Sequence, residues 1–165
     1  SCYNERNTHH MIAFYLKNTL SENGSVSRGE CEFDGDHYLI KITERTKIQK
    51  NVNELYYEEK GSKHLINDAN TPVSMNFWIF HPSIFPLLDK AWKQFLKSYS
   101  QDMIEEFFIP SAINSFLENE TIKVKVHFST EQWFGITYKE DVFYARKRIE
   151  KMKTDGEYPN YLWSN

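Results

Sequence analysis

The stretch SENGSVSRGECEFDGDHYLIKITERTK, residues 21–47, carries the side chains with the clearest potential for chemistry. A Ser-Arg-Gly sequence ends at Gly29 near its start, and Glu44-Arg45 lies near its end. Two strand-like runs flank an Asp-Gly-Asp turn signal at 34–36, so the stretch is predicted to form a hairpin. A glycine at one end and an acid–base pair at the other suggest a site for a small polar ligand. They also suggest that part of this site lies outside the chain.

Local motifs of several enzyme classes are missing from the sequence. It contains no Gly-rich phosphate loop of either common type, no GxSxG elbow and no HExxH pair. His9 and His10 are adjacent, so on a strand they would point to opposite faces, which is poor geometry for a metal. Cys2 and Cys31 have no CxxC spacing, which indicates neither a disulfide framework nor a zinc site. A reducing, cytoplasmic location is therefore expected.

Length and composition indicate one globular domain, residues 1–165. Aromatic residues make up 16%, well above what a disordered segment carries. The net charge is −3 and no basic stripe stands out, so nucleic acid is not expected as a partner. No apolar run approaches the roughly 18 residues that span a bilayer, so no membrane partner is expected either. The first ten residues show no secretory signal pattern.

The first part of the chain is rich in strand signals. An apolar run at 11–17 predicts a buried strand, and 18–25 has the composition of a loop. After the hairpin, the polar, turn-rich segment 49–71 is interpreted as a surface excursion with a short strand at Glu54–Glu58.

The second part alternates strands and helices. Residues 72–80 give the strongest signal for a buried strand, and Pro82 and Pro110 suit the first turns of two helices. Thr137 and Glu140 fit a capping box at the start of the last helix. This order predicts an α/β fold, a mixed β-sheet with helices packed on it. The predicted elements are helix 81–99, helix 110–119, strand 121–129 and helix 137–153.

Four segments, in this order, resemble the C-terminal half of the sugar-1-phosphate nucleotidyltransferases, the NDP-sugar pyrophosphorylases. The likeness runs from about Met11 to Trp163, and the order and spacing of the segments carry it. The tail from Tyr158 has the Tyr-Pro-x-x-Leu-Trp pattern of a bacterial branch of the family. The segments are NTLSENGSVSRGECEFDGDHYLIKITERTKI, TPVSMNFWIF, EFFIPSAINSFLENETIKVKV and QWFGITYKEDVFYARKRIEKMKTDGEYPNYLW.

This resemblance implies the C-terminal portion of a Rossmann-like nucleotidyltransferase fold. Such enzymes transfer a nucleoside monophosphate from a nucleoside triphosphate to a sugar 1-phosphate, or a related phosphorylated alcohol, and release pyrophosphate. Mg²⁺ is the expected cofactor, and a homo-oligomer is possible. The family's N-terminal half, with its Gly-rich loop and Mg²⁺-binding aspartate, has no counterpart here. We therefore expect this chain to supply the acceptor side and to be catalytically silent alone.

The hairpin supplies three of the site residues that the resemblance implies. Gly29 matches a glycine whose backbone approaches the sugar, which only a residue without Cβ permits. Glu44-Arg45 stands in place of a Glu-Lys-Pro motif, with the acid on sugar hydroxyls and the base on the phosphate. Arg45 and Thr46 depart from that motif, and arginine changes the geometry of the contact. The structural alternatives are a turn or bulge glycine and a solvated strand end.

Two further residues are implied as substrate-binding, Asn76 and Trp133. Arg28 is a third candidate with a weaker case, because it could border the ligand together with the loop Asn18–Gly24 but matches no motif. Asn76 lies where the family has Gly or Asn in the sugar pocket, although a buried asparagine can also serve a structural hydrogen bond. Trp133 matches a tryptophan before the family's second metal-binding aspartate, which Phe134-Gly135 replaces here. Nearby Asp141 is explained more simply by the dipole of a helix.

Two functions of other classes stay open. The chain could be a non-catalytic regulatory or assembly domain, which the altered Glu-Arg-Thr and the missing aspartate favour. It could also be a stand-alone sugar-binding domain. The substitution Arg45→Ala is expected to abolish binding of a sugar phosphate if the chain is part of the enzyme, and to change little in an assembly domain.

Overall fold

A computed structural model gives the fold of the chain. It describes residues 7–21, 24–52, 54–98, 106–136 and 139–161. These residues form seven β-strands, one 3-10 turn and three α-helices. The strands are β1 Thr8–Tyr15, β2 Val26–Phe33, β3 Leu39–Lys50, β4 Leu55–Glu59, β5 Ser62–Leu65, β6 Pro72–Ile79 and β7 Lys123–Ser129; the helices are α1 Ile84–Ser98, α2 Ile109–Glu118 and α3 Asp141–Thr154, with the 3-10 turn at Leu16–Asn18.

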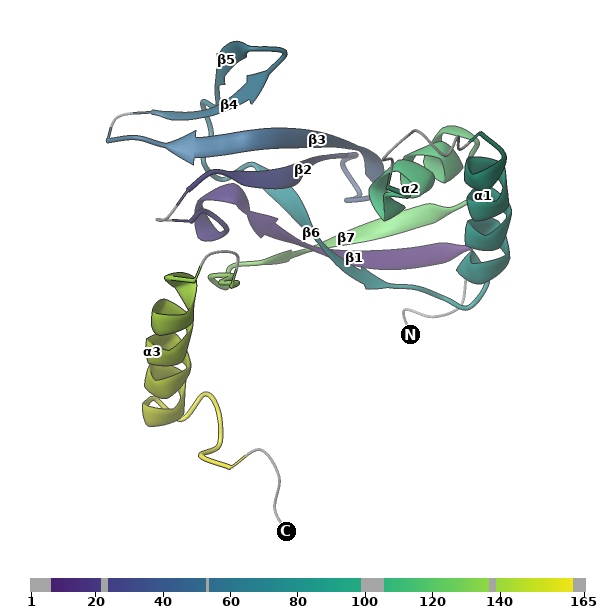
Figure 1. Cartoon of the computed structure of the whole chain (residues 1–165). Helices are drawn as coiled ribbons and strands as arrows, with labels where there is room; N and C mark the ends of the chain where they lie inside the picture. The colour runs from purple at the N-terminus through teal and green to yellow at the C-terminus, as the bar shows by residue number, and fades with distance from the viewer. Residues whose placement is uncertain (1–6, 22–23, 53, 99–105, 137–138, 162–165) are drawn as a thin grey trace.

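The strands form one mixed sheet in the order β5-β4-β3-β2-β6-β1-β7. β1 and β7 run parallel, and the other neighbouring pairs are antiparallel. Figure 1 shows α1 and α2 at one end of the sheet and α3 projecting from the other. The predicted α/β class with a mixed sheet and packed helices is confirmed. None of the helices in the described part of the chain is long and apolar enough to cross a membrane.

The predicted hairpin is confirmed as β2 and β3. Its turn is held by Asp34, whose Oδ1 accepts hydrogen bonds from the backbone N–H groups of Asp36 at 2.9 Å and Tyr38 at 2.8 Å. Across the hairpin, Gly29 pairs with Glu44 and Arg28 with Arg45. The two ends that carry the predicted chemistry therefore lie side by side.

The main core lies between the sheet and the first two helices. Apolar side chains of β1 and β7 alternate with outward-facing ones, and they pack against Ile84 of α1 and Ile113 of α2. α2 is also tied to the sheet through Asn114. Its side-chain Oδ1 accepts from the Ile42 N–H at 2.8 Å, and its Nδ2 donates to the Ile42 carbonyl at 2.7 Å. This amide satisfies the outer edge of β3 where no strand pairs with it.

A smaller core lies beyond the other end of β2. Leu16, Ile48 and Val73 are almost fully buried there. Tyr57 and Ile66 pack on it from the β4–β5 hairpin and the segment after it. The short strand predicted at Glu54–Glu58 is confirmed as β4, but the expected surface excursion at 49–71 is only partly correct, because Tyr57 and Ile66 pack on this core. The two-residue turn of the β4–β5 hairpin is Lys60-Gly61, and both residues have positive φ, as a type I′ turn requires.

The helix boundaries and one strand differ from the sequence predictions. α1 begins at Ile84, so Pro82 precedes the helix rather than opening it, whereas Pro110 lies in the first turn of α2 as predicted. α3 begins at Asp141 with Glu140 as its N-cap, later than the predicted capping box; Thr137 lies outside the described residues. β6 is not a fully buried strand, because Phe77 is 53% exposed.

Candidate functional site

Four of the predicted residues line one cavity of about 150 Å³. β2 contributes Arg28 and Gly29, β3 contributes Glu44, and β6 contributes Asn76. β2 and β6 pair at only two positions, Gly29 with Ser74 and Glu30 with Val73. The cavity lies at the end of this short pairing, beside Gly29 and Ser74. Its remaining lining residues are Ser27, Ser74, Met75 and Pro110.

Gly29 is needed for close packing of three strands. A Cβ atom added there would lie 2.6 Å from Cγ2 of Ile42, 3.4 Å from Cβ of Ser74 and 3.5 Å from Oε2 of Glu44. The first distance is shorter than any ordinary carbon–carbon contact, and Ile42 is a stiff, β-branched core residue. Gly29 sits within β2 and not in a turn, so the turn alternative does not apply. A glycine here lets β3, and with it Glu44, approach the cavity closely.

Glu44 lines this cavity and is exposed to solvent. Partial removal from water raises the pKa of Glu44, and the positive charge of Arg28 acts in the opposite direction. Within the described part of the chain, the carboxylate accepts no hydrogen bond and has no ion-pair partner. It can therefore accept hydrogen bonds from hydroxyl groups of a ligand.

Asn76 has a left-handed backbone conformation, with φ of 56°. The pairing of β6 with β1 is interrupted there, since Ser74 lies opposite Ala13 while Phe77 lies opposite Ile12. The Asn76 N–H donates to Oγ of Ser74 at 3.2 Å, and its side-chain oxygen accepts from the Trp78 indole at 3.3 Å. Asn76 is exposed, which corrects the expectation of a buried asparagine. Asparagine tolerates this conformation better than other residues with a Cβ.

Arg28 is held in place by the loop after the 3-10 turn. Its Nε donates to Oγ1 of Thr19 at 3.1 Å, one Nη donates to the Thr19 carbonyl, and the other donates to the Ser27 carbonyl at 2.7 Å. The guanidinium also stacks on Trp133, 5.2 Å from the ring centroid. Burial lowers the pKa of Arg28, and the nearby Glu44 carboxylate raises it.

Trp133 lines a neighbouring cavity of about 170 Å³ that Arg28 also borders. Its backbone N–H donates to the Asn18 carbonyl at 2.9 Å. Gly135 allows the indole to fold back, because a Cβ atom there would lie 2.2 Å from Cη2 of Trp133. Asp141, buried in the first turn of α3, lines the same cavity. The described residues contain no cluster of three His, Cys, Asp or Glu side chains suited to a metal, so no Mg²⁺ ligand is assigned.

The structure does not bring Arg45 to the Glu44 cavity. Adjacent residues of a strand point to opposite faces, so Arg45 lies on the other face of β3. There its Nε contacts Oε2 of Glu30 at 2.8 Å, one Nη lies 3.9 Å from a Glu59 carboxylate oxygen, and the guanidinium stacks on Tyr57 at 4.7 Å. Glu44 and Arg45 therefore do not form one charged fork.

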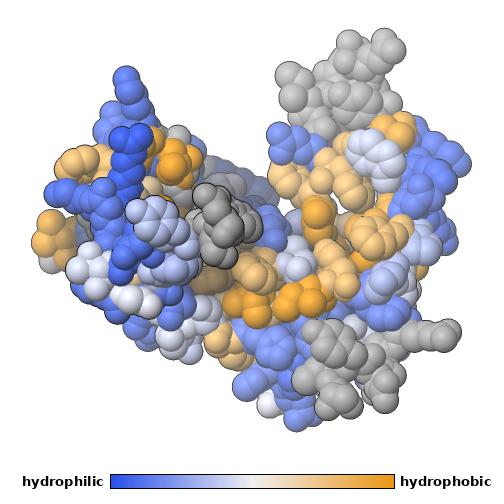
Figure 2. Space-filling view, turned by 90° about the horizontal axis from the view of Figure 1, so that it is seen from below, coloured by the Kyte–Doolittle hydropathy of each residue, from blue (hydrophilic) through white to orange (hydrophobic). Residues whose placement is uncertain are grey.

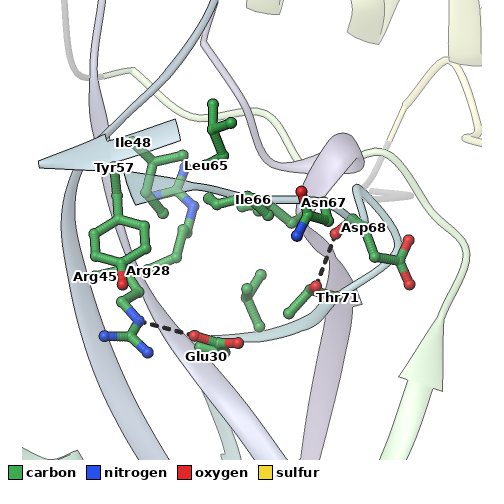
Figure 3. Close-up of a pocket in the computed structure, with 12 residues that line it drawn as sticks. Arg28, Glu30, Arg45, Ile48, Tyr57, Leu65, Ile66, Asn67, Asp68 and Thr71 are labelled. Atoms are coloured by element: carbon green, nitrogen blue, oxygen red, sulfur yellow. Dashed lines mark hydrogen bonds and ion pairs between the residues drawn. The ribbon is translucent and has the colours of Figure 1, made fainter. Parts of the chain in front are cut away.

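Arg45 lines a third cavity, of about 210 Å³, at the base of the β4–β5 hairpin. Figure 3 shows Arg45 beside Tyr57 with its bond to Glu30, and the Thr71 hydroxyl donating to the backbone carbonyl of Asp68. This cavity is larger than the one around Glu44. Of the predicted site residues, however, only Arg45, which is paired with Glu30, and Arg28 line it. The Glu44 cavity, with four of them, is therefore the stronger candidate for a ligand.

Two residues that the sequence did not single out complete the site. Thr19 is fully buried and anchors Arg28 through its hydroxyl and carbonyl groups. Ser74 is buried below Asn76 and bonds its backbone. The position of Thr19 in a loop next to the hairpin gave a weak signal, and Ser74 gave none. No protein-family profile matches this chain, and no curated protein matches it at a significant level.

Proposed function

We propose that this chain forms the acceptor-binding side of a nucleotidyltransferase. The acceptor is a sugar 1-phosphate or a related phosphorylated alcohol, and the sheet is the C-terminal portion of a Rossmann-like nucleotidyltransferase fold. The complete enzyme would transfer a nucleoside monophosphate from a nucleoside triphosphate to this acceptor and release pyrophosphate, with Mg²⁺ as cofactor.

One observation carries the proposal: Gly29, Glu44, Asn76 and Arg28 converge on the same small cavity. The resemblance selects Gly29 and Glu44 from the hairpin and Asn76 from a separate segment, and Arg28, next to Gly29, lines the same cavity. A carboxylate without hydrogen-bond donors and a guanidinium on neighbouring walls suit a ligand with hydroxyl groups and a phosphate.

In the proposed reaction, an oxygen of the acceptor phosphate attacks the α-phosphorus of the nucleoside triphosphate. The bond from the α-phosphorus to the bridging oxygen breaks, and pyrophosphate leaves with the electron pair. The residues of this chain bind and orient the acceptor, which lowers the entropic part of the barrier. Glu44 would fix the sugar hydroxyls, and the tight packing at Gly29 would fix the strand that bears Glu44. No step is assigned to a metal ligand of this chain.

The test is binding of glucose 1-phosphate and of other hexose 1-phosphates to the full chain, measured by isothermal titration calorimetry. Glu44→Gln keeps the shape of the side chain and removes its charge. Hydrogen bonds to a charged group contribute about 1.5–3 kcal/mol, so affinity should fall by about 10- to 100-fold. Glu32→Gln is the matched control, because Glu32 is an exposed carboxylate on the same hairpin. Equal affinities for both variants, or no binding of any sugar phosphate, would contradict the proposal.

A second candidate is a non-catalytic assembly domain, which the exposed hydrophobic side chains favour. Phe77 is 53% exposed and Phe108 is 58% exposed. Figure 2 shows hydrophobic residues gathered in the middle of the face seen from below. Large apolar patches mark interaction sites. This candidate predicts that the chain self-associates, that Phe77→Ser reduces the association in analytical ultracentrifugation, and that Glu44→Gln leaves it unchanged.

A further inference from the structure

We propose that Arg28, and not Arg45, binds the phosphate group of the ligand. The inference rests on the proposed function only for the identity of the rest of the ligand, since the phosphate itself can be tested alone. Arg28 and Arg45 lie opposite each other across the β2–β3 hairpin, and both stack on an aromatic ring, but only Arg45 has carboxylate partners among the described residues.

The charge of Arg45 is already compensated. Its guanidinium contacts two carboxylates, those of Glu30 and Glu59, and it stacks on Tyr57. The hydrogen bond to Glu30 raises the pKa of Arg45, because a carboxylate partner stabilises the charged form of the guanidinium. A phosphate at Arg45 would have to compete with Glu30 and would meet its negative charge at close range.

The charge of Arg28 has no such partner among the described residues. No carboxylate of this part of the chain lies within ion-pair distance of its guanidinium. Its three hydrogen bonds go to neutral oxygens of Thr19 and Ser27, which leaves one N–H group free on each terminal nitrogen. A partly buried cation without a counter-charge favours binding of an anion, because the anion replaces the water that the cation has lost.

Arg28 also lies where a phosphate is needed. It borders all three cavities, including the one that holds Glu44 and the one that holds Trp133. Glu44 is close enough to raise the pKa of Arg28 without contacting it. A phosphorylated sugar between them would place its phosphate on Arg28 and its hydroxyl groups on Glu44.

Thr19 and Trp133 act as positioning residues for Arg28. Thr19 holds the Nε and one terminal nitrogen, and the Trp133 ring covers one face of the guanidinium. A guanidinium fixed in this way loses little side-chain entropy when it binds phosphate. Thr19→Val should therefore weaken phosphate binding, and Thr19→Ser, which keeps the hydroxyl, should restore it. A purely structural role of Thr19 would change stability without this difference in affinity.

The test titrates the full chain with inorganic phosphate and, separately, with glucose 1-phosphate. Arg28→Gln should weaken binding of both by about tenfold or more, the effect of losing a charge-assisted contact. Arg45→Gln is the matched control, because Arg45 is the cross-strand partner of Arg28 and its charge is already paired with Glu30; it should change either affinity less than about threefold. Glu44→Gln should weaken binding of glucose 1-phosphate and not that of inorganic phosphate, which separates this inference from the proposed function.

A measurement on the unsubstituted chain covers the case in which Arg28→Gln does not fold. In nitrogen-15 NMR spectra, the Nε–H signal of Arg28 should shift on addition of inorganic phosphate, and that of Arg45 should stay unchanged. A shift at Arg45 alone, or equal losses of phosphate affinity in the two arginine variants, would overturn the inference. A loss of glucose 1-phosphate binding in Glu44→Gln with no response at Arg28 would overturn it while leaving the proposed function intact.

Discussion

Replacement of Gly29 by alanine tests how closely the strands around the cavity pack. The added Cβ would lie 2.6 Å from Cγ2 of Ile42, a methyl group attached directly to its own Cβ and buried in the core. The alanine Cβ has no rotatable bond, and moving Cγ2 by rotation about χ1 would displace the rest of the buried Ile42 side chain, so the core must repack or strand β2 or β3 must shift. Overpacking of this kind costs about 1–3 kcal/mol.

Alanine can adopt the backbone conformation of Gly29, because its φ is not left-handed. It also lowers the conformational entropy of the unfolded chain, which offsets about 0.4–1 kcal/mol of the cost of overpacking. The net loss in the free energy of unfolding should be about 1–2 kcal/mol. With a urea m-value of about 2 kcal/mol/M, the midpoint should fall by about 0.5–1 M. Gly35→Ala is the matched control, since no atom lies within 4 Å of a Cβ added there. Its free energy of unfolding should differ from that of the unsubstituted chain by less than about 0.5 kcal/mol.

A double-mutant cycle identifies the contact itself. Ile42→Leu moves the branch of the side chain from Cβ to Cγ and so removes the clashing methyl group. Gly29→Ala should then cost less in the Ile42→Leu background, with a coupling energy of about 0.5 kcal/mol or more. If Gly29→Ala matches Gly35→Ala, or if the cycle shows no coupling, the close approach of β2 and β3 is refuted.

Three other predictions concern titration, the edge of β3 and the buried thiol. Burial lowers the pKa of His9 and His127, so below their ordinary pKa of 6.5 the folded state binds fewer protons than the unfolded state. The urea concentration at the midpoint of unfolding should therefore decrease as the pH is lowered from about 7.5 to about 5.5, and a constant midpoint would contradict this. Asn114→Ala leaves the Ile42 N–H and carbonyl unpaired, so the free energy of unfolding should drop by about 1–3 kcal/mol, with faster hydrogen exchange at the Ile42 amide; unchanged exchange would rule out the side-chain bond. Burial raises the pKa of Cys31 to about 12, so with the other cysteine replaced by serine, iodoacetamide should label the protein only in denaturant, and rapid labelling of the folded protein would contradict that.

The sequence alone was sufficient to predict features that depend on the local alternation of apolar residues and on turn-forming residues. The hairpin was predicted from apolar alternation and an Asp-Gly-Asp turn, and the structure contains both the pairing of β2 with β3 and the turn held by Asp34. The same period predicted that His9 and His10 face opposite ways, and His9 is buried while His10 contacts His127 on the other face. Applied to Glu44-Arg45, that period also predicts opposite faces. The separation of these two residues was therefore present in the sequence once β3 was assigned.

Other features depend on tertiary contacts and left no local signal. The interruption at Asn76 arises where β6 meets β1, and an apolar strand with one asparagine does not reveal it. The short strand predicted at Glu54–Glu58 corresponds to β4, but β5 was missed because its four residues are all exposed and show no apolar alternation. The anchoring of Arg28 by Thr19 joins residues on either side of a loop, and loop geometry is not encoded in a period.

Irregular backbone gathers around the cavity that holds Glu44. The pairing of β2 with β3 shifts register between Val26 and Arg28, and that of β6 with β1 shifts on either side of the left-handed Asn76. Left-handed residues such as His37 lie in turns, where the chain reversal explains them, but Asn76 in β6 and Lys47 in β3 have this conformation within strands. Bulges and strained residues are common where a strand must redirect a side chain toward a ligand. After this shift, Arg28 lies opposite Arg45, and its guanidinium is bonded to Thr19 and also lines the Glu44 cavity. The backbone therefore favours this cavity as the ligand site on grounds that do not depend on any resemblance to a known family.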